Sequence, residues 1–563
     1  MAQYDLKIVG GTVVDGTGRP GFKGDVGIAN GKVVAVGDAP GDARQTYDAR
    51  GKVVAPGFVD VHTHYDAQVF WDRNMSISPW HGVTTVVMGN CGFGVAPTRP
   101  EDRRRILLTL EKVEGMSIDA LEAGLSATWP FESFPEYLDA IERSGSAINV
   151  GALLGHTPLR MYVMGEESTE REARPEEIDA MVKLAREGIE AGAIGFSTSG
   201  SKVHVGYEGR PVPSRLASFD EIRRLTKVMA DAGKGILQAN VGPSLFYDEF
   251  AELYRETGRP ITWTALLGGF WGPGQTHKYL DRALAQQQEG LNIVPQVACR
   301  PINFEFTFAE PFPFENLKLF KPVAAAGPDE KKRIYTDAAF RQSFKDEFGP
   351  TTQRVMSRWW DKTTIAFHPA DHALDERVLG DVARERGVDP VDLALDMALS
   401  TDLQTRFRLA ILNSDEKEVS GLLTSPGTLV SLSDAGAHAS QLCDACYSTH
   451  LLGYWVREKG IFSLEEAVKK LTADPTDLFG IAGRGRLAVG NHADVVVFDP
   501  ATIAAGPLRR VNDQPAGQDR LVADAVGVDL VVVNGTKVRQ DGRDLLAARG
   551  AMPGRLLRNG VAA

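Results

Sequence analysis

Two histidines stand one residue apart at the end of an apolar run, VDVHTH (59–64). On a strand, residues i and i+2 face the same side, so the imidazoles of His62 and His64 would point into one space and could hold one divalent ion. A bare pair of this kind is more often two histidines satisfied by ordinary hydrogen bonds. The pair therefore predicts a metal site only together with further donors.

A cysteine and an aspartate end two other apolar runs. Cys91 ends VTTVVMGNC (83–91) between two glycines that leave its thiol accessible, and Asp434 ends TLVSLSD (428–434). The carboxylate can bind a metal or take a proton from a metal-activated water. The alternatives are a cysteine that fills a core and an aspartate that caps a helix. Each of these signals is weak alone, but together, at the ends of apolar runs, they strongly indicate metal chemistry.

These four residues need a fold that brings distant runs together. Between residues 58 and 484, short apolar runs alternate with charged amphipathic stretches such as PEEIDAMVKLAREGIEAG (175–192). This alternation predicts a (β/α)8 TIM barrel, in which catalytic groups project from the carboxyl ends of the strands. Eight apolar runs follow VDVHTH, including TIAFHP (364–369), which is slightly more than a barrel needs. An open doubly wound sheet is the alternative.

The two ends of the chain share a β-like pattern. YDLKIVGGTVVDG (4–16) and DVGIANGKVVAVGD (25–38) are β-branched runs broken by turn-forming residues, and VDLVVVNGTKVRQDG (528–542) repeats the pattern. The simplest arrangement is one small β domain built from both termini. We expect residues 1–57 and 485–563 to form this domain and residues 58–484 to form the barrel.

One long segment interrupts the barrel pattern. Residues 300–362 are rich in Phe and Pro and show no clear period. Long irregular connections in compact domains are functional or disordered, and the Phe content argues against disorder. We expect an insertion that covers the barrel mouth or forms a subunit contact, and therefore a homo-oligomer.

Composition excludes several classes of partner. A formal charge of −12 argues against binding nucleic acid, which requires clustered Lys and Arg. No apolar run approaches the ~20 residues that a membrane helix requires, and the start of the chain has no secretory pattern. We expect a cytoplasmic protein that acts on a small-molecule substrate and does not bind membranes.

Several motifs are similar to those of a known group of hydrolases. They are PGFVDVHTH (56–64), GVTTVVMGNCG (82–92), GALLGHTPLR (151–160), GFSTSG (195–200), LSDAGAH (432–438) and GRGRLAVGNHADVVVFDP (483–500). With these motifs the chain resembles the amidohydrolase superfamily and, within it, the N-acyl-D-amino-acid deacylase group. The resemblance implies a TIM barrel with a small β-sandwich from both termini. It also implies that His62 and His64 bind one metal, that Cys91 replaces the modified lysine of many relatives, and that Asp434 is the general base.

Two positions depart from the deacylase pattern, which has a histidine at the end of the fifth and the sixth strand. The matching positions are Asn240 and Ala265, and no histidine occurs between His204 and His277. We therefore expect one Zn²⁺ rather than two, with another divalent metal as an alternative. Two other outcomes stay open: His204 or His277 enters the vacated place, or the site binds little metal.

The sequence indicates less about the substrate than about the metal site. Leu267 occupies the position at which the deacylase pattern has a basic residue near the substrate carboxylate. Aromatic residues follow in this region and in the insertion, and they favour a bulky apolar or aromatic acyl compound if they line the mouth: Phe270, Phe304, Phe306, Phe308, Phe312 and Phe314. The candidates for contact with substrate are His156, Arg160, Tyr207, Arg215, Trp263 and Trp271. His156 has a structural role as its alternative.

We therefore predict a metal-dependent hydrolase that cleaves an amide (N-acyl) bond with a metal-activated water and Asp434 as general base. One alternative is a hydrolase of another bond on the same scaffold, namely a lactam, imide, ester or carbon–carbon bond. The other alternative is a non-catalytic binding protein with a degenerate metal site.

Overall fold

A computed structural model of the protein describes residues 2–125, 129–272, 274–314, 317–348, 359–547 and 550–562. Its centre is an eight-stranded sheet in which every neighbouring pair is parallel. In spatial order the strands are β6 (Phe58–Asp60), β7 (Val83–Met88), β8 (Asn149–Gly155), β9 (Gly195–Ser199), β10 (Ile236–Asn240), β11 (Ile261–Thr264), β12 (Ile293–Val297) and β17 (Leu429–Val430).

The two edges of this sheet meet just beyond β6 and β17. Thr63 pairs in parallel with Ala435, and the backbone N–H of His64 donates to the Ala435 carbonyl at 2.8 Å. The sheet therefore closes, which confirms the predicted TIM barrel. The same closure brings the segment after β6, with its two histidines, against the segment that carries Asp434.

Amphipathic helices cover the outside of the barrel. In α5 (Pro175–Ala191), proline occupies the first turn, Gly192 follows the end, and Ile178, Met181, Ala185 and Ile189 are buried at a spacing of three or four residues, as one apolar helix face requires. The other helices between and after the barrel strands are α1 (Arg103–Glu114), α2 (Ile118–Leu125), α3 (Phe134–Ser144), α4 (His156–Met164), α6 (Phe219–Asp231), α7 (Tyr247–Thr257), α8 (Thr276–Gln288), α14 (Glu416–Thr424), α15 (Tyr447–His450), α16 (Leu464–Leu471) and α17 (Ala473–Phe479).

The run TIAFHP is not a barrel strand, which corrects the expectation from the sequence. It forms β14 (Thr363–Phe367) in a separate antiparallel sheet with β13 (Ile302–Thr307), β15 (Arg377–Val378) and β16 (Arg406–Leu412). A short β-branched run looks the same in either sheet, because only its pairing partner differs. Removing it leaves eight barrel strands, and we propose that the insertion extends from 302 to 412 rather than from 300 to 362.

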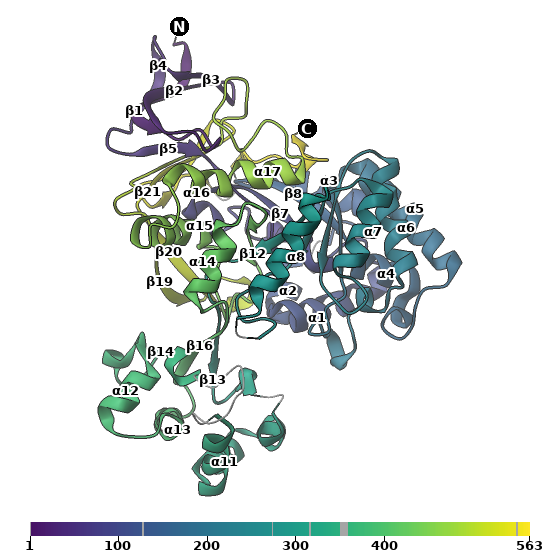
Figure 1. The fold of residues 1–563 in the computed structure, drawn as a ribbon, viewed down its shortest axis with the longest axis vertical. Coiled ribbons are helices and arrows are strands. Elements are labelled where there is room, and N and C mark those ends of the chain that lie inside the picture. The colour runs from purple at the N-terminus through teal and green to yellow at the C-terminus, as the bar shows by residue number, and fades with distance from the viewer. Residues whose placement is uncertain are drawn as a thin grey trace.

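The insertion has its own hydrophobic core. Phe306, Phe308 and Phe314 are buried there among aromatic and aliphatic side chains of its helices. These helices are α9 (Lys321–Ala325), α10 (Pro328–Thr336), α11 (Ala338–Phe348), α12 (Leu379–Arg386) and α13 (Pro390–Ser400). Figure 1 shows this unit projecting from the barrel on the side away from the terminal β strands. Residues 315–316 and 349–358 of the expected insertion, and the side chain of Phe312, lie outside the described part of the chain.

Both termini contribute to one nine-stranded sheet, as predicted. Its strands are β1 (Tyr4–Val13), β2 (Phe22–Ala29), β3 (Lys32–Gly37), β4 (Ala43–Asp48), β5 (Val53–Pro56), β18 (Val495–Phe498), β21 (Val528–Val533), β22 (Thr536–Gln540) and β23 (Arg543–Asp544). The Asn-Gly pairs at 30–31 and 534–535 form two of its two-residue hairpin turns, with positive φ at all four positions. Alternate residues of β1 and β18 share one core.

The remaining strands form two hairpins near the C-terminus. They are β19 (Ala504–Val511) with β20 (Arg520–Val526), and β24 (Leu557–Arg558) with β25 (Val561–Ala562). Among the described residues, no helix combines the length and the apolar character needed to cross a bilayer.

Candidate metal centre

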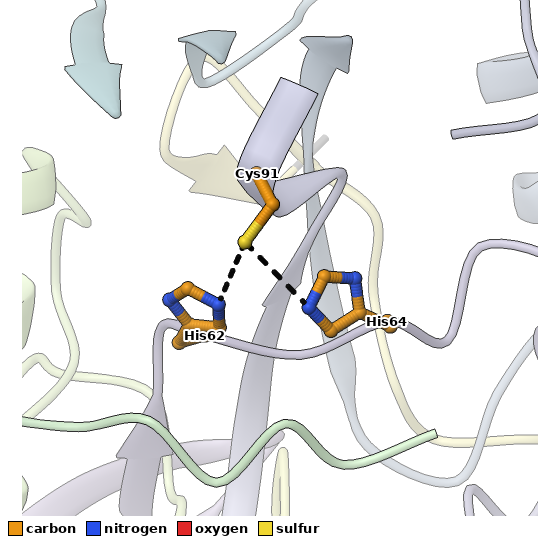
Figure 2. A group of neighbouring side chains, drawn as sticks. All are labelled: His62, His64 and Cys91. Atoms are coloured by element: carbon orange, nitrogen blue, oxygen red, sulfur yellow. Dashed lines mark hydrogen bonds between the residues drawn. The ribbon is translucent and has the colours of Figure 1, made fainter. Parts of the chain in front are cut away.

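His62, His64 and Cys91 converge inside the carboxyl end of the barrel. The Cys91 Sγ atom lies 3.3 Å from His62 Nε2 and 4.0 Å from His64 Nε2, and the three donor atoms all lie within 4.8 Å of one another. Figure 2 shows the thiol directed toward the gap between the two imidazoles. All three side chains are buried. The His-x-His pair and the cysteine, 27 or more residues apart, thus form one cluster.

The turn after β7 explains how the thiol reaches the histidines. Cys91 has a φ of 60° and is flanked by Gly89 and Gly92, both with positive φ. A Cβ atom at Gly89 would lie 2.3 Å from the Leu153 carbonyl oxygen, so glycine is required there. This tight turn directs the cysteine back over the barrel axis.

Asp434 completes the cluster from the far edge of the barrel sheet. Its Oδ1 atom lies 3.2 Å from His62 Nε2 and 3.7 Å from His64 Nε2. The side chain is 30% exposed, so water and a substrate can reach it, in contrast to the buried histidines. Ligands at 2.0–2.3 Å from a tetrahedral zinc are separated from one another by roughly 3.3–3.6 Å. The separations of 3.2 and 3.3 Å from His62 Nε2 fit that geometry, whereas those of 3.7 and 4.0 Å from His64 Nε2 are longer. The donor types are those that zinc prefers.

The second nitrogen of each histidine faces an oxygen atom from another element. His62 Nδ1 lies 2.7 Å from Oε1 of Gln296 on β12, and His64 Nδ1 lies 3.5 Å from Oε1 of Glu114 at the end of α1. A proton on Nδ1 leaves the Nε2 lone pair free, and both Nε2 atoms face the cluster. Metal-binding histidines are oriented in this way by outer partners.

The electrostatics of the cluster favour a cation. Burial opposes ionisation of Cys91, but the charge of His62 and hydrogen bonds from both histidines outweigh it and lower the thiol pKa to about 6. Burial also opposes the charge of Asp434, yet the same histidines hold its pKa well below the usual value. The pKa of His62 is raised to about 10, since Cys91 and Asp434 outweigh its burial. In the metal-free protein, protons on the imidazoles balance the thiolate and the carboxylate, and a bound divalent ion would displace them.

Neutral side chains occupy the ends of β10 and β11, where the sequence predicts that two histidines are lacking. Gln238 Oε1 accepts from the Cys91 N–H at 2.6 Å, and its Nε2 lies 3.5 Å from Asn240 Oδ1 and 3.4 Å from Thr264 Oγ1. Ala265 follows Thr264 at the end of β11. These residues supply an amide network beside the cysteine and no imidazole.

Neither of the two histidines considered as replacements joins the cluster. His204 lies in the loop after β9, where its Nδ1 pairs with Ser199 Oγ at 2.8 Å and its ring packs on Phe93 at 5.2 Å. Burial and the charges of His64 and His438 lower the pKa of His204 to about 3, so it is neutral. His277 is exposed on α8. In this arrangement neither His204 nor His277 supplies a donor to the cluster.

Three residues expected to contact substrate are buried away from the cluster. Nε2 of His156 lies 2.7 Å from Glu221, Arg160 also pairs with Glu221, and all three side chains are fully buried. Trp263 lies on β11 one residue out of phase with the interior Thr262 and Thr264. Its ring consequently packs outward, 5.4 Å from that of Phe246 beside α7. All three side chains are packed in the interior, so the structure does not support the expected contact with substrate.

The other expected contacts lie in loops, where none touches the four donors among the described residues. Arg215 Nη1 donates to the His204 carbonyl at 2.9 Å, and Tyr207 packs under Arg210 in the same loop. Trp271 stacks on Tyr279 of α8 at 3.9 Å. Of the insertion phenylalanines, Phe304 contacts the loop that carries Asp434, with its ring 5.7 Å from the ring of His438.

Glu114 and Gln296 were missed in the sequence, although each has a recognisable signal. Glu114 follows Ile106, Leu107 and Leu110 on the buried face of α1, and an acid on an apolar face needs a reason. Gln296 is a polar residue inside the apolar run IVPQV of β12, with a side chain that is 0% exposed. Neither signal names the histidine that the residue would contact.

The chain is similar to known hydrolases over nearly its whole length. A model described as the amidohydrolase family matches residues 45–307 and 354–539. D-aminoacylase of Alcaligenes xylosoxydans xylosoxydans is 29% identical over 557 residues, which are 96% of this chain and 95% of that protein.

Two solved structures extend this similarity to three dimensions. One is a D-aminoacylase whose binuclear metal centre is described as showing one-metal activation and second-metal attenuation; it is 27% identical with a TM-score of 0.65 over 98% of this chain and 99% of that one. The other is N-acyl-D-glutamate deacylase from Bordetella bronchiseptica, complexed with zinc and a phosphonate inhibitor that mimics the tetrahedral intermediate. It is 26% identical with a TM-score of 0.64 over 99% of each chain.

Proposed function

Because the chain belongs to the amidohydrolase family, whose members here include deacylases acting on carbon–nitrogen bonds other than peptide bonds, we propose that it hydrolyses an N-acyl amide with one divalent ion, Zn²⁺. The single observation that carries this proposal is the convergence of His62, His64 and Cys91, whose donor atoms lie within 4.8 Å of one another, with Asp434 Oδ1 at 3.2 Å from His62 Nε2 and 3.7 Å from His64 Nε2. The amide network at Gln238, Asn240 and Thr264 supports one ion rather than two, because it lacks the ligands of a second.

Each residue of the cluster has its own role in the proposed reaction. A zinc ion in this cluster would polarise the scissile carbonyl and lower the pKa of the attacking water towards ~7. Asp434 is ionised, partly exposed and next to both imidazoles, so its carboxylate accepts the proton of the attacking water and returns it to the leaving nitrogen. His62 and His64, held by Gln296 and Glu114, keep the donor geometry unchanged during these transfers.

The substrate proposal is an N-acyl amino acid with an apolar acyl group. The names of the relatives support the amide class, and Phe304 beside His438 supports an apolar acyl group. Phe306, Phe308 and Phe314 do not support an apolar acyl group, because they are buried in the core of the insertion. Arg215 is the remaining candidate of the expected set for a substrate carboxylate.

The test combines metal analysis with turnover. We expect about one zinc per purified chain and release of amine from N-acetyl, N-benzoyl and N-phenylacetyl D-amino acids, with their L forms, an ester and a cyclic imide as comparison substrates. Full activity in a metal-free preparation would overturn the metal mechanism. Turnover of the ester or imide alone would assign a different bond, and no turnover by the zinc-loaded chain would indicate a binding protein.

Asp434→Asn tests the proposed base. We expect kcat to fall by about 10²–10⁴-fold, the usual contribution of a general base, while zinc per chain stays nearly intact. Asp389→Asn is the matched control, because Asp389 caps α13 far from the cluster and asparagine caps a helix equally well. Wild-type activity in Asp434→Asn would remove Asp434 from this role.

A further inference from the structure

Glu114 is an acid that the fold holds away from water. It is the last residue of α1, and Gly115, with a φ of 56°, ends the helix directly after it. Glu114 is 3% exposed, and the side chain belongs to the buried face of the helix. A carboxylate in this position is costly unless an opposite charge balances it.

No arginine or lysine provides that balance within the described part of the chain. Among the described residues, the one charged contact of the Glu114 carboxylate is His64 Nδ1, at 3.5 Å. His64 presents its other nitrogen to Cys91 Sγ at 4.0 Å and to Asp434 Oδ1 at 3.7 Å, two further acidic groups. Three acids therefore surround one imidazole, and a divalent cation on the far side of that imidazole would balance this excess.

The backbone of Glu114 is fixed to the loop that carries Asp434. Its carbonyl oxygen accepts a hydrogen bond from the His438 N–H at 2.5 Å. Gly115 packs directly against the His438 ring, since a Cβ atom at Gly115 would lie 2.9 Å from His438 Nδ1. The side chain of Glu114 therefore approaches His64 from a held position, and changing that side chain leaves the backbone contact in place.

We propose that Glu114 is a positioning residue that keeps the proton of His64 on Nδ1, directs Nε2 toward the metal and strengthens zinc binding through its negative charge. This inference rests on the proposed metal site. The two histidines then differ as ligands: His62 is oriented by the neutral amide of Gln296, and His64 by a carboxylate. The carboxylate makes His64 the more strongly polarised ligand of the pair.

The experiment measures the Zn²⁺ dissociation constant of the full-length protein by competition with a chromogenic chelator. We expect Glu114→Ala to raise this constant by about 10–100-fold, the usual effect of losing an outer partner of a metal-binding histidine. Glu114→Gln should raise it less, because the amide oxygen still accepts the Nδ1 proton although the charge is gone. Melting temperatures of the metal-free variants show whether each one folds.

Glu221→Gln is the matched control, since Glu221 is also a buried glutamate facing a buried histidine, His156, at 2.7 Å. It should leave the zinc dissociation constant of the folded protein unchanged. Equal zinc affinity in wild type and Glu114→Ala, or an equal rise in Glu221→Gln, would overturn the role of Glu114. A wild type that binds no zinc would instead overturn the proposed function and this inference with it.

Discussion

Two buried histidine–glutamate pairs, His64–Glu114 and His156–Glu221, lie in the same barrel and differ in what surrounds them. Both nitrogens of His156 are engaged, Nδ1 with Thr198 Oγ1 at 2.8 Å and Nε2 with Glu221 at 2.7 Å, while Arg160 also pairs with Glu221. His64 uses only Nδ1 for its glutamate and keeps Nε2 for the cluster. A buried carboxylate partner therefore does not identify a metal ligand, whereas a nitrogen left free to face other donors does.

The pKa values of the two glutamates reflect the same difference. Burial raises the pKa of Glu114 to about 8, and His64 offsets it only in part. Burial also opposes the charge of Glu221, but hydrogen bonds and charges from His156 and Arg160 outweigh it and lower the pKa of that carboxyl. Arg160 is the permanent cation that keeps Glu221 ionised. Glu114 has no such partner among the described residues, so its carboxyl would be ionised at neutral pH only beside a bound cation.

Replacing each histidine should separate the pairs most clearly. We expect His64→Ala to lose its zinc and to lower kcat/KM by more than the roughly 10–100-fold that an outer partner contributes. His156→Ala should keep the zinc content of wild type, because His156 has no nitrogen available for a metal. Metal per chain and initial rates on both purified variants check this. Equal loss of zinc in the two variants would break the comparison.

Removing each glutamate should separate the pairs by stability. Glu221→Ala strands the fully buried Arg160, so we expect the free energy of unfolding to fall by about 3–5 kcal/mol. Glu114→Ala strands no arginine, and the metal-free protein should lose less. Urea denaturation of both metal-free variants measures the difference. A larger loss in Glu114→Ala would mean that the fold, rather than the metal, requires Glu114.

Lowering the pH should change the stability contribution of Glu221, by less than the substitutions above do. The pKa of Glu221 is lowered in the folded protein from an ordinary value of 4.5, so its stabilising contribution is present above that pH and is lost as the pH falls further. The difference in unfolding free energy between wild type and Glu221→Gln should therefore shrink from pH 6 to pH 4. Thermal melting across this range tests the sign, and a difference that grows would contradict the pairing.

Sequence patterns predicted the barrel well, because each strand and helix is encoded locally. The eight barrel strands, the β domain from both termini and the Asn-Gly turns at 30–31 and 534–535 were all visible as short-range signals. TIAFHP was misplaced, since a local pattern does not name the sheet that a strand joins. The Phe-rich segment was expected to cover the barrel mouth or form a subunit contact, and Phe306, Phe308 and Phe314 instead pack in a core of the insertion itself. The homo-oligomer and the cytoplasmic location stay predictions.

The sequence alone determined which metal-binding side chains are available. His62, His64, Cys91 and Asp434 each stand at the end of an apolar run, and such runs meet at one end of a barrel. Only the tertiary structure decided which side chains orient them. Glu114 and Gln296 come from a helix end and a strand far along the chain, and their contacts depend on barrel closure and on the register of neighbouring strands. The same long-range packing placed His156, Arg160 and Trp263 in the core, although their local sequence resembles that of a binding site.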